Sequence, residues 1–294
     1  MIYYKKEMGL MKKCYVLFLI FLFIMFSKDV SLAATVGNPL DLDVPSMSAV
    51  LRQEIVKRTL DEYEQIVKIK ASLDVEFLFG KDLHTTSEVD GAELSGEWYM
   101  IKIGTTIFNK IEPYIKLGTA NLKADWKQHG TYDIEVVADS GFALGWGIKG
   151  IIAEVEDWGV RLTGDFQYRT AELDVSEISW GNTGIIDSGA DFDIEEWQTS
   201  FILSKKFELP LKSKNIYIVP YTGFNYSDSN VDVRFTNPSD TMQHWTLYEA
   251  NNDSKLGFVL GCDIMPNLIS SFIYSLELRF MNEFALSLGG ATKF

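Results

Sequence analysis

Residues 272–294 read FIYSLELRFMNEFALSLGGATKF. In the first part of this stretch, positions 272, 274, 276, 278 and 280 carry Phe, Tyr, Leu, Leu and Phe, and the positions between them carry Ile, Ser, Glu and Arg. Successive side chains of a strand point to opposite faces, so the pattern predicts a strand with one apolar and one mostly polar face. Lipid outside and water inside a closed sheet would satisfy both faces.

The same alternation continues to the last residue. Phe284, Leu286 and Leu288 share one face, the positions between them carry Ala and Ser, and the chain ends on Phe294. This ending resembles that of bacterial outer-membrane β-barrel proteins, whose last strand typically ends in Phe after alternating apolar residues. The resemblance implies an all-β fold, a transmembrane antiparallel up-and-down β-barrel, and makes Phe284, Leu286, Leu288 and Phe294 its barrel-assembly signal.

The N-terminal segment 1–34 is predicted to be a cleaved export signal. Lys12 and Lys13 precede an uncharged, mostly apolar run from Cys14 to Phe26, and small residues at 31–34 suit a signal peptidase. A membrane-spanning helix needs about 20 apolar residues, so this run is short for a span. A retained N-terminal anchor is the alternative.

Charge and cysteine content narrow the function classes. Without residues 1–34 the chain has 22 basic and 39 acidic residues, a formal charge of about −17. So acidic a chain repels nucleic acid, which excludes it as a partner. Cys262 is then the single cysteine, so no intrachain disulfide can form.

Residues 35–70 are predicted to be a periplasmic leader that ends in a short helix over 46–70. Val56, Leu60, Tyr63 and Val67 fall on one helical face, and charged residues fill the other. Such a helix could lie in the periplasm, plug the barrel or contact a neighbouring protein.

From residue 71 onward, alternation predicts ten strands, with eight or twelve as alternatives, in a barrel over 71–294. Short links fall near 108–111, 154–157, 209–214 and 265–269, and long ones near 81–96, 123–139, 173–195 and 228–253. Outer-membrane barrels have short periplasmic turns, long external loops and an even strand number, so ten strands fit. Pro220 is awkward inside a strand because it cannot donate a hydrogen bond.

A soluble β-sandwich is the structural alternative, because alternating strands alone do not distinguish the two. Aromatic residues near the predicted strand ends favour the membrane, since amphipathic rings prefer its interfaces. They are Trp98, Trp126 and Trp197 at outer ends and Phe108, Tyr114, Trp158, Phe207 and Phe294 at inner ends.

The polar faces of the predicted strands carry charges of both signs that should point into the lumen. A barrel of about eight strands is filled by side chains, whereas one of sixteen or more holds an aqueous channel. An internal salt-bridge core is therefore favoured over a conducting pore. The residues predicted to face the lumen are Lys102, Lys116, Lys149, Arg161, Asp165, Arg169, Asp263, Glu277 and Arg279, and Asp74, Glu76 and Lys206 belong to the same wider set.

Residues 172–196 contain eight acidic residues and no Lys or Arg. Clustered carboxylates suit hard cations such as calcium, which could bridge this segment to lipopolysaccharide. The spacing does not match an EF-hand loop, so a solvated, mobile acidic loop is expected, with no metal and no cofactor.

An enzyme is the low-ranking alternative. The omptin proteases are ten-stranded outer-membrane barrels, and their site combines two aspartates with an Asp-His couple that activates water. Asp191 and Asp193, with Asp82 and His84, resemble these residue types, but their order along the chain differs from that of the omptins.

The sequence therefore predicts a non-enzymatic outer-membrane barrel that is structural or narrowly porin-like. A surface adhesin that binds an extracellular ligand through the 228–253 segment is the alternative; Phe235, Met242, Trp245 and Tyr248 interrupt the polar residues there. Expected partners are outer-membrane lipid, lipopolysaccharide and the barrel-assembly machinery.

Overall fold

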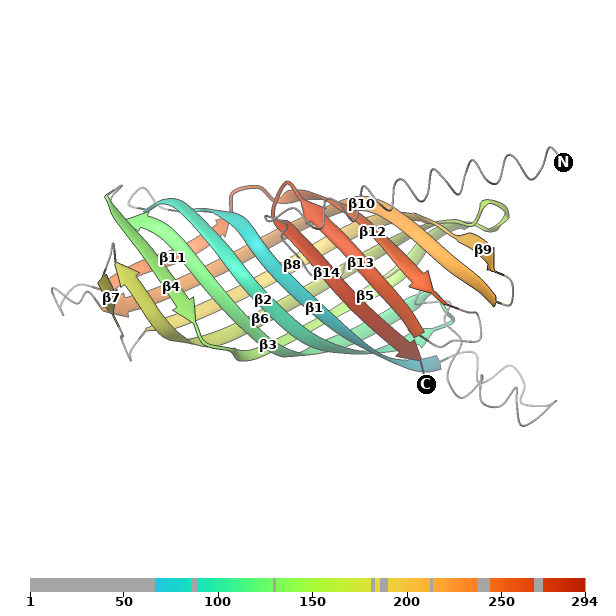
Figure 1. Ribbon diagram of the computed structural model, residues 1–294, viewed down its shortest axis with the longest axis horizontal. Coiled ribbons are helices and arrows are strands. Elements are labelled where there is room, and N and C mark those ends of the chain that lie inside the picture. Colours follow the sequence, from blue (N-terminus) through green and yellow to red (C-terminus); the bar gives the residue numbers. More distant parts are fainter. Residues whose placement is uncertain are drawn as a thin grey trace. The chain divides into compact units, whose positions relative to one another are not determined.

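The structure, a computed structural model, describes residues 67–85, 89–128, 131–180, 183–185, 190–211, 214–236, 244–266 and 272–293. These residues form one sheet of fourteen strands (Figure 1). Within the same ranges, no helix is long and apolar enough to cross a membrane. The strands are β1 (Val67–His84), β2 (Val89–Ile107), β3 (Ile111–Gln128), β4 (Tyr132–Ala138), β5 (Gly141–Val155), β6 (Val160–Trp180), β7 (Thr183–Ile185), β8 (Asp191–Lys205), β9 (Phe207–Leu211), β10 (Lys214–Thr236), β11 (His244–Asn252), β12 (Leu256–Met265), β13 (Phe272–Phe280) and β14 (Phe284–Lys293).

Ten strand segments close into an antiparallel ring. It runs β1, β2, β3, β5, β6, β8, β10, β12, β13 and β14, and β14 returns to β1 in a register that extends from Lys70↔Lys293 to Gly80↔Phe284. β4 continues the line of β5 between β3 and β6, β9 continues β8 along β10, and β11 continues β12 along β10. The ring confirms the predicted ten-stranded up-and-down barrel.

The segments predicted as long loops are instead mostly strand, so that part of the prediction is wrong. β1, β2, β3, β4, β6, β8, β10 and β11 run past the ends of the other strands and pair with one another. β11 meets β1 at Leu83↔Asn252 and His84↔Asn251, beyond the short hairpin that ends β13 and begins β14. These eight strands form what is called here the extension, residues 80–84, 89–96, 121–128, 132–138, 171–180, 191–196, 227–236 and 244–252.

Polarity inverts where the barrel passes into the extension, and on β3 it does so without a change in the phase of the alternation. On β3, outward positions are Ile115 and Leu117 in the barrel but Lys123 and Asp125 in the extension. Inward positions change in the opposite sense, from Lys116 to Leu122 and Ala124. The barrel therefore has an apolar outside and a polar inside, as hydrocarbon requires, and the extension has the reverse, as water requires.

The outward apolar side chains of the ring form a band that only lipid can cover. A soluble monomer rarely exposes a contiguous apolar surface of this extent. The exposed members include Ile69, Leu73, Phe79, Ile101, Ile103, Ile115, Leu117, Leu144, Trp146, Ile148, Phe201, Leu203, Phe224, Leu256, Leu260, Phe272, Tyr274, Phe284 and Leu288.

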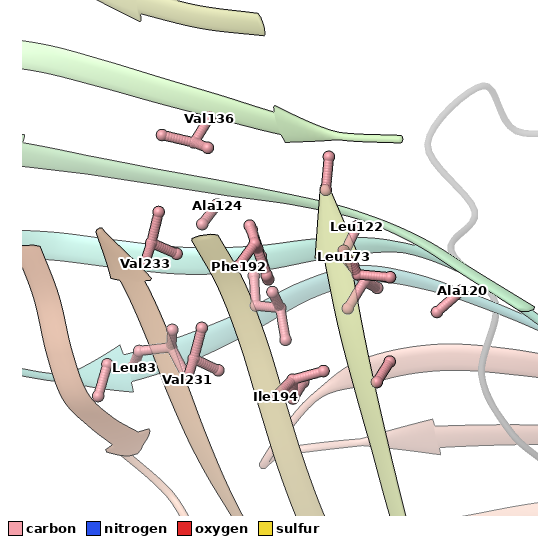
Figure 2. Packing of buried hydrophobic residues seen from close by; sticks show 14 of the residues in the cluster. Leu83, Ala120, Leu122, Ala124, Val136, Leu173, Phe192, Ile194, Val231 and Val233 are labelled. Carbon is pink, nitrogen blue, oxygen red and sulfur yellow. The ribbon is translucent and has the colours of Figure 1, made fainter. Parts of the chain in front are cut away.

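Inside the extension and at its border with the barrel, the inward side chains pack into an apolar cluster, the cap core (Figure 2). Phe192, Leu122 and Val231 come from three different strands and are fully buried there. The members of the cap core are Leu78, Leu83, Val89, Ala92, Leu94, Trp98, Met100, Ala120, Leu122, Ala124, Trp126, Ile134, Val136, Ala138, Ala143, Ala171, Leu173, Ile178, Ala190, Phe192, Ile194, Val231, Val233, Ala250 and Ala285.

Three of the predicted interface aromatics lie inside instead. Trp98 and Trp126 belong to the cap core, and Tyr114 is buried in the lumen. Trp98, Trp126 and Tyr114 lie an even number of residues from the inward side chains of Lys102, Leu122 and Lys116, respectively. The face of the strand on which a residue lies therefore decides its burial, whatever its distance from the strand end. Trp197, Phe108, Trp158 and Phe207 are exposed, as expected of residues at the membrane interfaces.

Pro220 is accommodated by a break in one neighbouring ladder. β10 pairs with β8 from Tyr221↔Ser204 and with β9 from Ile218↔Phe207, which leaves Val219 and Pro220 opposite the break at Lys206. The N–H that proline lacks is therefore not needed there.

The predicted helix over 46–70 is wrong at its end, because residues 67–70 belong to β1 and pair with β2. Their alternating Val-Lys-Ile-Lys pattern suits a strand with one inward face. Residues 1–66, with the predicted export signal and leader, lie outside the described residues, as does Phe294.

The inversion boundary predicts opposite outcomes for arginine at two positions on one face of β3. Ile115→Arg should destabilise the barrel by about 2–4 kcal/mol because it places a charge against hydrocarbon. Asn121→Arg, on the same face but within the extension, should change the stability by less than about 0.5 kcal/mol. Urea unfolding in lipid vesicles would measure both, and equal costs would show that the boundary does not lie between these residues.

Candidate functional site

The charged residues predicted to face the lumen lie inside the barrel. Eight of the nine are no more than 5% exposed: Lys102, Lys116, Lys149, Asp165, Arg169, Asp263, Glu277 and Arg279. The ninth, Arg161, is half-buried at the end of the barrel and pairs with Glu154, Nη2 to Oε1 at 2.6 Å. Asp74 and Glu76 are also buried, and Lys206 is half-buried with its Nζ 5.0 Å from the ring centre of Tyr217.

Five further charged side chains are buried in the lumen but were not among the residues predicted to face it: Lys70, Lys81, Glu112, Glu196 and Glu283. The even spacing from Lys116 would have found Glu112. Lys81 could not be found by parity, because a bulge between Leu78 and Lys81, opposite Gly96 with its φ of +137°, shifts the register. Lys70 and Glu196 lie in segments that the sequence assigned to a helix and to an acidic loop, and Glu283 shares the polar face of the last predicted strand with Ala285 and Ser287.

Six of these side chains form a compact ion-pair cluster, the lumen network: Glu76, Lys81, Arg169, Glu196, Arg279 and Glu283. Lys81 Nζ lies 2.5 Å from Glu196 Oε2 and 2.9 Å from Glu283 Oε2. Arg169 pairs with Glu76 and, at 3.0 Å, with Glu196 Oε1. Arg279 Nε lies 3.1 Å from Glu283 Oε1, and its Nη2 lies 3.7 Å from Glu76 Oε1. Three cations thus face three carboxylates.

Neutral amides connect the lumen network to the next polar layer. Arg279 donates to Gln198 Oε1 at 2.5 Å, Gln167 Nε2 donates to the same oxygen at 3.1 Å, and Lys116 donates to Gln167 at 3.0 Å. Lys116 also lies 3.5 Å from Asp74. The polar layer is therefore continuous across the width of the lumen.

Further pairs fill the lumen towards its other end. Tyr114 donates to Asp165 at 2.9 Å, and Lys70 pairs with Glu112 at 2.6 Å. Tyr221 donates to Glu277 at 3.0 Å. A buried charge is tolerated only when it is paired and hydrogen-bonded, and these contacts meet that requirement.

The lumen is close to electrically neutral. Among the described side chains, seven buried basic residues stand against eight buried acidic ones: Lys70, Lys81, Lys102, Lys116, Lys149, Arg169 and Arg279 against Asp74, Glu76, Glu112, Asp165, Glu196, Asp263, Glu277 and Glu283. Among the described residues, the excess of acidic over basic side chains therefore lies outside the lumen.

Trp98 joins the lumen network to the cap core. Its ring, fully buried, lies 4.2 Å from the guanidinium carbon of Arg169, within the range of a cation–π contact. A layer of ion pairs and a layer of apolar side chains thus follow each other along the barrel axis. A solute in the lumen would have to disrupt both.

Ser229, Lys81 and Glu196 resemble a hydroxyl nucleophile with its base. Lys81 Nζ lies 2.8 Å from Ser229 Oγ, which donates to Glu196 Oε2 at 2.7 Å. All three lie just beyond the last lipid-facing residues of their strands and are buried. Burial alone would lower the pKa of Lys81, but the carboxylates of Glu196 and Glu283 outweigh it, and the pKa is raised. A protonated, inaccessible lysine cannot act as a general base, so the trio is structural.

The residues that resemble an omptin site do not come together. Asp82 and His84 lie on β1, Asp191 and Asp193 lie on β8, and β10 and β11 stand between these strands in the ring of the extension. All four side chains point outward. His84 instead has its Nδ1 3.9 Å from Asp253 Oδ1, with both side chains more than half exposed.

The outward face of the extension carries carboxylates in rows that run from strand to strand. Asp82, Glu93, Asp125 and Glu135 are successive register partners on β1, β2, β3 and β4. Like charges directly opposite each other on neighbouring strands are destabilising. Within the described ranges, no group of three or more His, Cys, Asp or Glu side chains is placed to hold a metal ion.

A second row of carboxylates runs across the outward face of three other strands. Glu172, Asp193 and Asp232 are register partners on β6, β8 and β10. Partial burial raises the pKa of Asp193, and the carboxylates of Glu172 and Asp191 raise it further. The described parts of the predicted acidic segment 172–196 are thus mainly paired strand, and Asp187 lies outside them.

The C-terminal residues of the predicted assembly signal lie on the lipid side of β14. Phe284 and Leu288 are exposed. Leu286 shares their face but is only 1% exposed, because it lies between its register partners Phe77 and Leu278.

No family model and no curated protein matches the chain. Among solved structures, it is similar to the outer membrane protease OmpT from Escherichia coli, with 9% identity and a TM-score of 0.44 over 81% of this chain and 99% of that one. It is also similar to the translocator domain of the autotransporter NalP from Neisseria meningitidis (10% identity, TM-score 0.33, 84% and 91% covered) and to the toluene transporter TbuX from Ralstonia pickettii (7%, 0.34, 90% and 96%). Similarity at this level carries no information on activity.

Arg169→Met should cost about 3–5 kcal/mol of stability, because it leaves Glu76 and Glu196 buried beside one cation fewer. Arg234→Met is the matched control: Arg234 lies 3.7 Å from Asp232 on the exposed wall, and its loss should cost less than about 1 kcal/mol. Denaturant unfolding would measure both. Adding Glu196→Gln to Arg169→Met should recover part of the loss, and similar costs for the two single variants would contradict the proposed role of the network.

Glu93→Gln should stabilise the extension at neutral pH. Partial burial raises the pKa of Glu93, and the carboxylates of Asp82 and Asp125 raise it further. A carboxyl group with a raised pKa binds its proton more tightly in the folded state, so its stabilising contribution exists at low pH and is lost as the pH rises through that pKa. The gain from the variant should therefore be present at pH 7 and shrink towards pH 4 in thermal unfolding.

Asp133→Asn is the control for this experiment, because Asp133 has Lys127 as a neighbour at 3.7 Å. It should not stabilise the protein at either pH. A gain from Glu93→Gln that is independent of pH would refute the electrostatic explanation.

Proposed function

We propose that this chain is a non-enzymatic protein of the bacterial outer membrane, closed to solutes, whose extension serves as a rigid surface outside the cell. The observation that carries the proposal is the two-layer seal formed by the lumen network and the cap core. Of the two roles that the sequence suggests, structural and narrowly porin-like, the seal supports the structural one.

Conduction would require breaking buried ion pairs. An ion that entered the lumen would displace Lys81, Arg169 or Arg279 from their carboxylates, and separating a buried pair costs several kcal/mol. Conducting pores instead line an aqueous lumen with exposed polar side chains. In the described part of this barrel the inward charged residues are almost completely covered.

The exposed apolar band supports placement in the outer membrane, since a closed barrel is one of the two structures that can satisfy its backbone in hydrocarbon. The alternation in β14, with Phe284 and Leu288 on the lipid side, is offered as the mark that the assembly machinery recognises. Outer-membrane lipid and lipopolysaccharide are the partners that this placement implies.

The wall of the extension supports a role in surface contact. Together with residues 97, 139, 253 and 255, which adjoin the extension, its described outward side chains include seventeen acidic residues against four basic ones: Asp82, Asp90, Glu93, Glu97, Asp125, Asp133, Glu135, Asp139, Glu172, Asp174, Glu177, Asp191, Asp193, Glu195, Asp228, Asp232 and Asp253 against Lys123, Lys127, Arg234 and Lys255. The strands hold these charges in place, so the surface is both charged and pre-organised, which favours selective association.

Planar-bilayer recording on the refolded chain tests the closed state. No stepwise conductance is expected, under conditions in which a general porin added to the same bilayer conducts. Reproducible steps from the wild-type chain would contradict the proposal. Heat-modifiable gel mobility would show that the silent sample is folded.

Peptide cleavage tests the absence of enzyme activity. Incubation of the folded protein with a mixture of peptides should leave them intact. Cleavage that disappears in both His84→Ala and Asp193→Ala would refute the non-enzymatic assignment and revive the omptin-like alternative.

A further inference from the structure

β11 has a strand partner on one side along its whole length and on the other side only at its end. With β10 it pairs from Thr236↔His244 to Asn230↔Asn251. With β1 it pairs at two positions, Asn251 and Asn252, because β1 ends at His84. Among the described residues, none pairs with the second edge of β11 over 244–250.

An open strand edge presents a row of backbone N–H and C=O groups that can pair with another extended chain. Recognition by strand addition uses these groups for affinity and is a recurrent way of binding peptides. The edge of β11 belongs to the extension; β11 pairs with β10 and contributes Ala250 to the cap core. The template is therefore already in the geometry that an added strand needs.

The charge of the extension selects the kind of chain that fits. Its described wall, together with the residues that adjoin it, carries seventeen outward acids and four bases, so a basic segment would be attracted to it and an acidic one repelled. A second copy of this protein would bring the same acidic wall against its own. Charge complementarity thus favours a basic partner over self-association through this edge.

We propose that the open edge of β11, residues 244–250, binds an extended basic polypeptide segment by adding it as a strand. The inference rests on the proposed function in one respect, because that function places the extension outside the cell. A conducting wild-type barrel would overturn the proposed function and leave the peptide test unaffected.

The test uses the full-length refolded protein in detergent micelles and a labelled peptide that alternates Lys with Thr and Val. Fluorescence anisotropy should show binding that weakens as salt is raised, because exposed charges are screened. Hydrogen exchange should slow at the backbone amides of 244–250 when the peptide is present. A matched peptide with Glu in place of Lys should not bind.

A third peptide separates strand pairing from charge alone. It keeps every Lys but carries N-methyl groups on alternate backbone amides, which prevents pairing, and it should bind at least about tenfold more weakly. Equal binding of the methylated and unmethylated peptides, or unchanged exchange at 244–250, would overturn the proposal. So would protection of 244–250 that grows with protein concentration without peptide, since that result would identify a second copy as the occupant.

Proline variants test the same edge from the protein side. Neighbouring residues of a strand point their N–H groups in opposite directions, so one of Thr246→Pro and Leu247→Pro removes a donor from the open edge. That variant should lose peptide binding and keep heat-modifiable mobility. Retained binding in both variants would count against strand addition.

Discussion

The register between β1 and β14 is the contact on which the rest of the structure depends. In hydrocarbon, an unpaired backbone N–H or C=O group costs several kcal/mol, so a sheet can cross the membrane only if its first and last strands meet. The pairs from Lys70↔Lys293 to Gly80↔Phe284 provide this closure. Closure in turn fixes which face of each strand looks inward, and this choice brings the side chains of the lumen network together from five different segments of the chain.

The extension is a second solution to the same problem in a different solvent. It has no hydrocarbon around it, and its eight strands are held by the cap core as a soluble barrel would be. The hairpin between β13 and β14 ends below it, and Glu283 turns inward there to pair with Lys81. This short hairpin is therefore the place where a ring of ten strands becomes a ring of eight.

Alternation along 272–280 and 160–169 was enough to predict the barrel and the faces of most of its charged residues. It failed where the chemistry of the faces inverted: 123–128 keeps the same period, but with Lys123 and Asp125 outside and Ala124 inside, and so it looked like a loop. Trp98 and Trp126 were placed from their position near strand ends, when their parity already indicated the interior. Lys81 lies beyond a bulge that only the three-dimensional register shows. The local sequence pattern therefore shows which residues share a face of a strand. The pairing of distant strands determines where that face changes from polar to apolar.

Ion pairs fill the lumen, whereas an apolar core fills the extension directly beyond it. This difference follows from the alternation of apolar and polar residues along the barrel strands. Replacing a buried charge network by apolar side chains is often neutral or stabilising, so stability alone does not explain the network. A strand with lipid on its outside and an apolar core on its inside, however, would be apolar at every position. Such segments approach the hydropathy of membrane-spanning helices, whereas alternating segments give a much weaker signal. Charged residues such as Lys116, Arg169 and Arg279 keep the barrel strands alternating. The extension is polar outside, so its strands alternate with an apolar interior.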